Sequence, residues 1–515
     1  MAIQLVLLGC LLLPAAAQSQ PVGEAKLLLK IKRVWGDPPK LAAWSAAAST
    51  GGAHCRWPYI RCDSTGRVTS LALARTNVTG PVPDAIGGLS SLARLDVSYN
   101  RITGAFPTAL YRCRSLRYLN LFWNHIGGEL PDDIVHGLGA NLSMLNLGVN
   151  KFNGTIPVSL SRLQNLRHLA LEENLFVGSI PMELGELTSL EILNLSDNLF
   201  DAGHLPASFK NLTNLVSLSM DNCSLVGDVP SNVAKLPELE ELSLMYNSFT
   251  GTIPSAIWGL KKLEWLDVSG INLTGDVVVD GFTAISLVFF RASENNLTGM
   301  IPEVFSRLRN LTYMLLSNNN FSGEIPLSIG RMPSLKTLSL SGNRLTGMLP
   351  SELGKYSLSL SDVSIADNKL TGTIPEWLCA GGHLESLSAS SNRLNGSIPV
   401  RLANCANLVV LNLDNNQLSG EVPKAIWTIR ELVVVFLRNN SLTGSLPAMM
   451  SNSLRELDIG NNQFVGRIPT AALGLVRFIA ENNQFSGEIP SHIGYGMPLL
   501  RHLNFANNKL SGNIG

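Results

Sequence analysis

A phrase of the form L-x-L-x-x-N-x-[LF]-x-G-x-[IVL]-P recurs along nearly the whole chain, and this repeat limits the possible folds more than any other feature. Aligning the copies places their framework residue, which is usually Asn, mostly 24 or 25 residues apart. A period of this length predicts a solenoid, in which each copy forms one coil that stacks on the next. The nineteen framework positions are 76, 100, 124, 150, 174, 198, 223, 247, 271, 295, 319, 343, 368, 392, 416, 440, 462, 483 and 508.

The residue types within each copy explain why such coils would stack. Alternate side chains of a strand point to opposite faces, which predicts that Leu193 and Leu195 lie inside and that Ile192, Asn194 and Ser196 lie outside. We expect neighbouring strands to pair into a parallel sheet. The framework amide can satisfy backbone groups that the following turn leaves unpaired. No single coil can bury its own apolar side, so only stacking produces a core.

Three framework positions do not hold Asn, namely Thr76, Cys223 and Ile271. Thr and Cys keep some hydrogen-bonding ability, whereas Ile271 has none, and its coil also carries Val278 where Pro is expected. We therefore expect a local irregularity in this coil. Two explanations stay open: harmless variation of the repeat, or a bend or loop that serves recognition.

The segment before the first coil has the features of a cap. GEAKLLLKIKRVW has apolar residues at helical spacing, and it is followed by Trp44 and by CRWPYIRC, in which Cys55 and Cys62 bracket Trp57. A solenoid needs such an atypical end. In an oxidising compartment a Cys55–Cys62 disulfide should stabilise the fold by about 2–3 kcal/mol. The alternative, part of a metal site, lacks the second pair of ligands that zinc would need.

Together, the helix, the Cys-x-Trp-x4-Cys cap and the repeats resemble the extracellular domains of plant leucine-rich repeat receptor-like kinases, over residues 18–515. The phrases WGDPPKLAAW and LNLFWNHIGGELP are similar to the HAESA-like group of peptide receptors. The resemblance implies an α/β repeat solenoid, a right-handed superhelix with an inner parallel sheet, a short second sheet and an irregular or 3₁₀-helical outer face.

The chain divides into three predicted segments. An apolar run from Ile3 to Leu13, followed by Ala15 to Ala17, indicates a signal peptide over residues 1–17, with a buried N-terminal helix as the alternative. The cap follows at 18–67 and the repeats at 68–515. Gly515 stands where the last copy should have Pro, so we expect a coil cut short, as in a receptor truncated before its membrane helix and kinase. As written, the chain would be secreted; a full-length relative would sit on the extracellular side of the plasma membrane.

Several functions are disfavoured by what the sequence lacks. It has no Gly-rich loop with V-A-I-K, H-R-D and D-F-G, no nucleophile elbow and no H-E-x-x-H. The strand carboxylates sit in separate coils, unlike the gathered pair of a glycosidase. Lys plus Arg and Asp plus Glu both total 39, so no overall basic field favours nucleic acid. We predict no enzyme, no cofactor, no metal and no membrane-spanning segment in this chain.

A band of large side chains occupies the outward strand positions of coils two to eleven. Exposed aromatic residues are enriched at recognition hot spots, although single rings can instead pack on neighbours across the sheet. The resemblance implies a secreted peptide ligand and a leucine-rich repeat co-receptor kinase. No coil has the paired Arg-x-Arg that some of these receptors use for a peptide carboxylate. The predicted ligand-binding residues are Tyr118, Phe122, Trp123, Met245, Tyr246, Trp265, Asp267, Arg291 and Tyr313.

The remaining predictions from the sequence concern glycosylation sites and the other cysteines. Sequons on the inner side at Asn194 and Asn439 would obstruct that face if they carried glycans. Cys379 and Cys405 fall in consecutive coils and are candidates for a bridge, with buried thiols as the alternative. The predicted glycosylation sites are Asn77, Asn141, Asn153, Asn211, Asn272, Asn296, Asn310, Asn320 and Asn395.

The function predicted from the sequence is that of an extracellular recognition domain of a plant receptor-like kinase or receptor-like protein. It would bind a secreted peptide on its inner face and signal through a co-receptor. The alternative is a secreted inhibitor or decoy, similar to the plant inhibitors of pectin-degrading enzymes.

Overall fold

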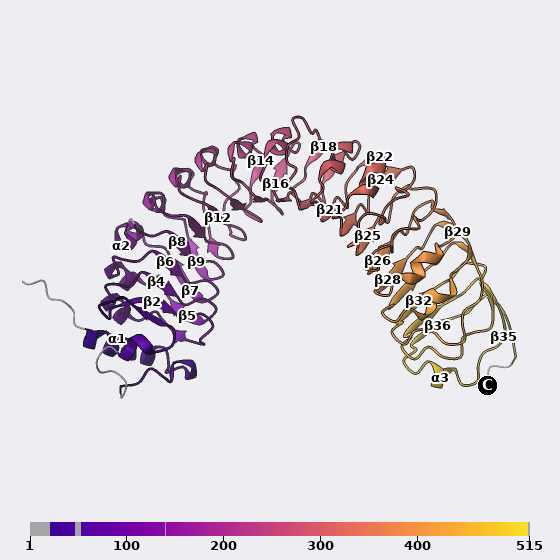
Figure 1. Ribbon diagram of the computed structural model, residues 1–515, viewed down its shortest axis with the longest axis horizontal. Helices are drawn as coiled ribbons and strands as arrows, with labels where there is room; N and C mark the ends of the chain where they lie inside the picture. Colours follow the sequence, from indigo (N-terminus) through magenta and orange to yellow (C-terminus); the bar gives the residue numbers. More distant parts are fainter. Residues whose placement is uncertain (1–20, 47–52, 140, 513–515) are drawn as a thin grey trace, which may run out of the picture. The chain divides into compact units, whose positions relative to one another are not determined.

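A computed structural model describes residues 21–46, 53–139 and 141–512 (Figure 1). The predicted signal peptide lies outside the described residues. Within them, no helix has the length and apolar character needed to cross a membrane. The chain forms two compact units, an N-terminal unit that ends at Val177 and a C-terminal unit that begins at Gly178.

The N-terminal unit begins with helix α1 (Pro21–Val34) and then stacks its coils on an inner sheet. Strand β1 pairs antiparallel with β2, and the later strands pair in parallel. The outer side carries α2 (Ile134–Leu138) and 3₁₀-helices at Asp84–Gly88, Thr108–Arg112 and Val158–Arg162. The inner strands are β1 (Ile60–Cys62), β2 (Val68–Ala72), β4 (Arg94–Asp96), β6 (Tyr118–Asn120), β8 (Met144–Asn146) and β10 (His168–Ala170). A second sheet contains β3 (Thr79–Gly80), β5 (Arg101–Gly104), β7 (His125–Glu129), β9 (Lys151–Gly154) and β11 (Leu175–Phe176).

The C-terminal unit repeats the same plan, with fourteen parallel inner strands among its described residues. They are β12 (Ile192–Asn194), β13 (Ser217–Ser219), β15 (Glu241–Ser243), β17 (Trp265–Asp267), β19 (Phe289–Arg291), β21 (Tyr313–Leu315), β23 (Thr337–Ser339), β25 (Asp362–Ser364), β26 (Ser386–Ser388), β28 (Val410–Asn412), β30 (Val434–Phe436), β32 (Glu456–Asp458), β34 (Arg477–Ile479) and β36 (His502–Asn504). The leucine-rich repeat fold predicted from the sequence is therefore confirmed.

The second face of this unit consists of short groups of paired strands rather than one continuous sheet. The groups are β14 (Val226–Asp228) with β16 (Ser248–Thr250); β18 (Thr274–Asp276) with β20 (Asn296–Thr298); β22 (Ser322–Glu324) with β24 (Arg344–Thr346); β27 (Asn395–Gly396), β29 (Gln417–Glu421) and β31 (Ser441–Thr443); and β33 (Val465–Gly466), β35 (Gln484–Glu488) and β37 (Lys509–Ser511). Outer 3₁₀-helices lie at Met182–Glu186, Ala207–Asn211, Ser231–Lys235, Ser255–Gly259, Glu303–Arg307, Leu327–Arg331, Val400–Asn404 and Lys424–Thr428, with α3 at Ile493–Gly496.

The framework asparagines hold neighbouring coils together, as the sequence predicts. The Asn343 side chain is buried and its Nδ2 donates to the carbonyls of Leu316 and Leu340, both at 3.0 Å. Its Oδ1 accepts the backbone N–H of Phe321 at 3.0 Å. One amide therefore satisfies backbone groups of its own coil and of the preceding coil. Unpaired groups of this kind would otherwise carry a desolvation penalty in the core.

The coil that contains Ile271 is irregular, which confirms that expectation. Ile271 is fully buried, and its backbone N–H donates to Oδ1 of Asn295, in the next coil, at 3.2 Å. The same oxygen also accepts the N–H of Leu273 at 2.9 Å, and Asn295 Nδ2 donates to the carbonyl of Val268 at 2.8 Å. Asn295 thus satisfies backbone groups of the Ile271 coil as well as of its own coil. Residues 260–302, all of which the structure describes, contain no 3₁₀-helix on the outer side.

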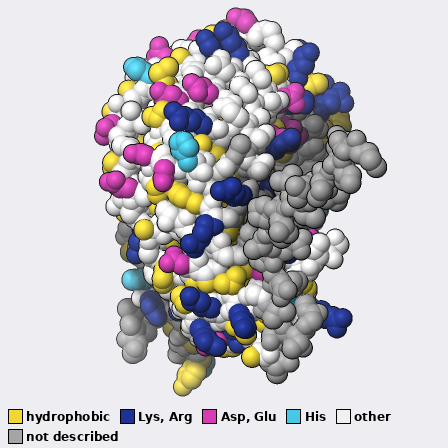
Figure 2. Space-filling view, turned by 90° about the vertical axis from the view of Figure 1, so that its left-hand side faces the viewer, with side chains coloured by type: hydrophobic (Ala, Val, Ile, Leu, Met, Phe, Trp, Pro, Cys, Tyr) yellow, Lys and Arg dark blue, Asp and Glu magenta, His cyan; other side chains and the backbone are white. Residues whose placement is uncertain are grey.

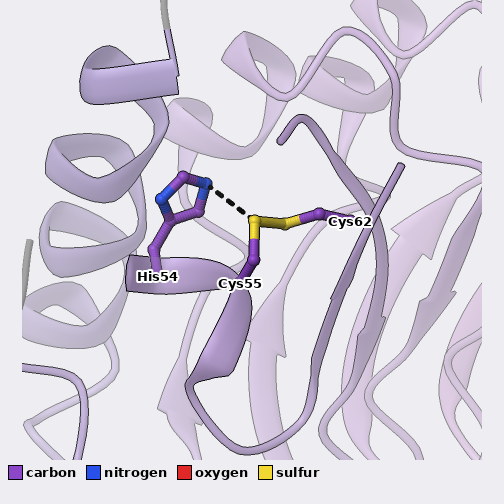
Figure 3. Close-up of side chains that lie close together, drawn as sticks. All are labelled: His54, Cys55 and Cys62. Atoms are coloured by element: carbon purple, nitrogen blue, oxygen red, sulfur yellow. Dashed lines mark hydrogen bonds between the residues drawn. A yellow bond between two sulfur atoms is a disulfide. The ribbon is translucent and has the colours of Figure 1, made fainter. Parts of the chain in front are cut away.

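The cap is held by a disulfide bond between Cys55 and Cys62, the pairing expected from the sequence (Figure 3). His54 Nε2 lies 3.5 Å from Cys55 Sγ, and the Trp44 ring stacks on Trp57 with centroids 6.0 Å apart. Because both sulfurs are bonded to each other, neither is a thiolate that could hold a metal ion. The metal alternative for this segment is therefore not supported.

The other described cysteines divide into one bridge and two thiols. Cys379 and Cys405 form a disulfide, so the bridge between consecutive coils is present. Cys113 and Cys223 are buried free thiols. Burial raises the pKa of Cys113 to about 11, which keeps this thiol protonated and unreactive at neutral pH.

Candidate ligand-binding surface

Three aromatic side chains stand side by side on the inner sheet of the C-terminal unit. Trp265 pairs in register with Phe289, and Phe289 with Tyr313, on strands β17, β19 and β21. The Trp265 and Phe289 rings are stacked with centroids 3.6 Å apart, and Phe289 lies 5.7 Å from Tyr313. We call Trp265, Phe289 and Tyr313 the aromatic row. Trp265 remains 41% exposed, so the row offers apolar surface that a ligand can cover.

An ion pair lies beside the aromatic row on two of the same strands. Asp267 and Arg291 are register partners, and their Oδ2 and Nη1 atoms are 3.7 Å apart. Asp267 is buried and also accepts hydrogen bonds from the backbone and hydroxyl of Ser269. Asp267 is therefore placed to orient the Arg291 guanidinium, and its own contact with a ligand stays a prediction. The Arg291 side chain is half-buried, and it is the member of the pair that a ligand can reach.

Met245 and Tyr246 lie in the coil that directly precedes the coil of Trp265. The Met245 N–H donates to Asp221 Oδ1 at 2.9 Å, and the Met245 side chain is half-buried. Tyr246 is 50% exposed, and its ring passes over Gly270, where an added Cβ would lie 2.8 Å from ring atom Cδ1. Gly270 thus leaves room for this ring, which faces solvent next to the coil of Trp265.

The other predicted residues lie in the N-terminal unit, where they form a separate group. Phe122 and Trp123 both contact Tyr99, with ring centroids 5.2 and 5.7 Å from it. Tyr118 differs because the Arg94 guanidinium lies 3.5 Å above its ring. That ring packs on its neighbour across the sheet, which is the alternative that the sequence left open. Its role in ligand binding stays a prediction.

Residue Phe289 is the member that the predicted ligand-binding set lacks. Its ring lies between Trp265 and Tyr313, so the row is continuous only when Phe289 is included. The signal was present in the sequence, since Phe289 occupies the same outward position as Trp265 and Tyr313 in successive copies. Phe289 belongs to the band of large outward residues in coils two to eleven, although it is not among the nine predicted ligand-binding residues.

Arg438, farther along the same sheet, is already paired within the protein. Its guanidinium contacts Asp458 at 3.4 Å and also contacts Glu481, and its backbone N–H donates to Asp414. Burial raises the pKa of Asp414 to about 6. An arginine held by two carboxylates is a poor partner for a peptide carboxylate. Arg291 is therefore the better candidate for an anionic ligand group.

The predicted glycosylation sites are placed on accessible surface. All nine side chains are exposed except Asn320, which is half-buried. On the inner face, Asn439 Nδ2 donates to Asn415 Oδ1 at 2.6 Å, so the side chain of that sequon is engaged in a row of amides. Asn194 is half-buried and accepts the Ser196 N–H. Glycan occupancy at all these positions stays a prediction.

Glu172, on the inner side of the N-terminal unit, is a carboxyl group with a perturbed pKa. An added Cβ at Gly148 in the neighbouring coil would lie 2.4 Å from Glu172 Oε1, so the carboxyl lies over this glycine. Its Oε2 is buried without a hydrogen-bond partner. Burial, with a smaller contribution from Glu173, raises the pKa of Glu172 to about 7.

We expect Glu172 to contribute stability at low pH that is lost as the pH rises. Its folded pKa of about 7 exceeds the ordinary value of 4.5, so its contribution is complete below about pH 4.5 and is lost as the pH rises through about 7. The Glu172→Gln variant should be up to about 2 kcal/mol more stable than the wild type at pH 8, with no gain at pH 4.5. Guanidinium unfolding at both pH values measures this difference. An equal pH dependence in both proteins would show that Glu172 is not the cause.

Comparisons with known proteins agree with the leucine-rich repeat fold described above. Models of leucine-rich repeats match residues 66–126, 140–288, 293–348, 383–405, 407–429 and 453–475. The ectodomain of the Arabidopsis receptor kinase HAESA, solved with an N-terminally extended IDA peptide hormone, is 31% identical with a TM-score of 0.82. The match covers 96% of this chain and 91% of that one.

Two further solved complexes match across most of the chain. HAESA bound to IDA and the co-receptor SERK1 is 29% identical, with a TM-score of 0.80 and coverage of 95% of this chain and 91% of that one. The PEPR1–AtPEP1 complex is 28% identical, with a TM-score of 0.67 and coverage of 95% and 82%.

Curated relatives match over shorter segments. Polygalacturonase inhibitor 1 of Oryza sativa subsp. japonica is 34% identical over 85 residues, which are 16% of this chain and 25% of the relative. MDIS1-interacting receptor like kinase 1 of Arabidopsis thaliana is 39% identical over 80 residues, 15% of this chain and 8% of the relative. The matched segments thus span a quarter or less of these relatives.

One inner strand per coil, a ladder of framework asparagines and a cysteine-bridged cap define a leucine-rich repeat solenoid. The match to the HAESA ectodomain, which extends over 96% of this chain, places it among the receptor kinase ectodomains within this class. The chain belongs to the family of plant leucine-rich repeat receptor kinase ectodomains.

Proposed function

We propose that this chain is the extracellular recognition domain of a receptor kinase or receptor-like protein, and that it binds a secreted peptide on its inner face. The observation that carries this proposal is the aromatic row beside Arg291. Support comes from HAESA, which was solved with the peptide hormone IDA and the co-receptor SERK1. A leucine-rich repeat co-receptor kinase is accordingly the proposed second partner.

The mode of binding follows from the order of the strands. A peptide that lies across β17, β19 and β21 would cover the three rings in turn and remove their exposed surface from water. Arg291 would donate to a carboxylate or carbonyl of the peptide, and its pairing with Asp267 would fix the direction of the guanidinium. The reaction of this domain is binding, and any phosphoryl transfer would belong to a separate kinase domain.

A calorimetric titration tests the proposed function. IDA and AtPEP1 are titrated separately into the protein, first alone and then with the SERK1 ectodomain present. We expect one of these peptides, or a related secreted peptide, to bind with one-to-one stoichiometry and to bind more tightly when SERK1 is present. Heat from SERK1 without any peptide, at the same affinity as with peptide, would contradict ligand-dependent recruitment of the co-receptor.

The bounds of the three segments and the location of the protein are also part of this proposal. Residues 1–17 would be a signal peptide, 18–67 the cap and 68–515 the repeats. The chain would act outside the cell, either secreted or on the extracellular side of the plasma membrane. Protein sequencing of the secreted product should find an N-terminus at Gln18, whereas retention of Met1 would contradict the signal peptide.

A secreted inhibitor is the second candidate function, favoured by the match to polygalacturonase inhibitors. In that case the inner face would bind a pectin-degrading enzyme in place of a peptide. Purified protein added to a polygalacturonase assay discriminates the two. We expect unchanged enzyme activity at micromolar protein; stoichiometric inhibition would favour the inhibitor.

A further inference from the structure

A pocket of about 570 Å³ in the N-terminal unit is separate from the aromatic row. Positively charged, titratable and aromatic side chains dominate its lining, and no Asp or Glu contributes to it. We call it the Arg75 pocket. It is lined by Arg75, Asn77, Tyr99, Asn100, Arg101, Trp123 and His125.

A stack of three side chains forms one wall of the Arg75 pocket. The Arg75 guanidinium lies 4.3 Å above the Tyr99 ring, and Tyr99 stacks on Trp123 with an interplanar angle of 24°. Arg75 belongs to the coil before Tyr99 and Trp123 to the coil after it, so both faces of the Tyr99 ring are covered. What Tyr99 presents to solvent is its edge and hydroxyl. Ring edges carry the positive part of the aromatic quadrupole, which favours anions.

Among the residues that the structure describes, the two arginines of the pocket have no acidic partner. None of the ion pairs found among the described residues includes Arg75, Arg101 or His125. Lys40 adds a further positive charge nearby, since its Nζ donates to the Arg75 carbonyl at 2.7 Å. On the side of the molecule drawn in Figure 2, the lower part shows several Lys and Arg side chains and few Asp or Glu side chains, whereas the upper part shows both kinds. The positive charge of the pocket is therefore uncompensated.

We propose that the Arg75 pocket binds a carboxylate group of a partner peptide. The planar guanidinium of Arg101, and the N–H edge of Arg75 that its stacking on Tyr99 leaves free, are suited to bidentate carboxylate recognition. Asn77 and the Tyr99 hydroxyl add polar contacts. The carboxylate comes from an acidic side chain or from the C-terminus of the peptide, and both sources present the same chemistry.

Three synthetic peptides distinguish the two sources. The first is Glu-rich with an amidated C-terminus, the second has only a free C-terminal carboxylate, and the third is the Gln-substituted, amidated form with neither. Calorimetry should show binding of the first or the second peptide and at least about tenfold weaker binding of the third. The carboxylate-bearing peptide should also bind more weakly at higher salt. Equal binding of all three peptides, or no binding of any, would overturn the proposal.

Variants of pocket residues test whether the peptide binds at the Arg75 pocket. The double variant Arg75→Gln and Arg101→Gln should weaken the carboxylate-bearing peptide at least about tenfold. Arg117→Gln, which removes an exposed arginine of the same unit outside the pocket, should change the affinity less than about twofold. Equal affinities in both variants would move the site elsewhere. Binding of IDA and AtPEP1 is measured in separate titrations, so failure of the Arg75 pocket and failure of the proposed hormone site are distinguishable.

The sequon at Asn77 adds a control. Because Asn77 lines the pocket, a glycan there would compete with the peptide. The titrations are therefore made before and after enzymatic removal of the glycans. Binding in either form, lost in the double variant, supports the pocket; its absence in both forms contradicts it.

Discussion

The Trp265→Ala variant should bind the recognised peptide at least about 30-fold more weakly than the wild type, a loss typical of an aromatic hot spot. The substitution removes the exposed ring and also the 3.6 Å stacking that holds Phe289 in place. Both effects act on the surface that the peptide would cover. Calorimetry with the peptide that binds the wild-type protein measures the change.

Two control variants separate a local from a general effect of this substitution. Trp265→Phe keeps a stacked ring and should recover most of the affinity. Tyr495→Ala removes an aromatic side chain that is 87% exposed on α3, and it should not change the affinity. If Trp265→Ala bound the peptide as tightly as the wild type, the aromatic row would not be the binding site.

The Asn295→Ala variant should lose about 2 kcal/mol more free energy of unfolding than Asn319→Ala, although both are framework positions. Without Asn295, the Val268 carbonyl and the N–H groups of Ile271 and Leu273 lose the partner that the amide supplies. Without Asn319, Asn295 still donates to the shared Ala292 carbonyl. The difference arises at Ile271, because its side chain has no amide that could donate to the Val268 carbonyl in the absence of Asn295. Guanidinium unfolding of the two variants measures it.

A double-mutant cycle tests this explanation directly. Ile271→Asn replaces a fully buried apolar side chain and should destabilise the wild-type protein. In the Asn295→Ala background the new amide would reach the Val268 carbonyl, so the same substitution should be less harmful there. A coupling energy of about 1 kcal/mol in that direction is expected. Simple additivity would show that the two positions do not share these backbone groups.

The fold was predictable from the sequence because it depends on local, repeated chemistry. The Leu and Asn of each copy determine what that coil buries and how it turns, as Leu193 and Asn343 illustrate. Ile271 could be recognised as a defect for the same reason. How the defect is compensated was not predictable, because the answer lies in Asn295 of the next coil.

The binding surface was predictable only in part, because it depends on contacts between coils. Position along a strand identified Trp265, Arg291 and Tyr313 as outward residues. It did not show that Asp267 is buried against Arg291, or that the Arg94 guanidinium covers Tyr118. These pairings join residues 24 apart in sequence, and they emerge only when the register of the coils is known.

Photo-crosslinking from the inner face tests peptide binding most directly. The photo-reactive residue p-benzoylphenylalanine is placed at position 289, within the aromatic row, and separately at position 400, where Val400 is 76% exposed on an outer 3₁₀-helix. After irradiation with the bound peptide, mass spectrometry should find the peptide joined to position 289 and not to position 400. Crosslinking from position 400 alone would contradict binding of the peptide on the inner face.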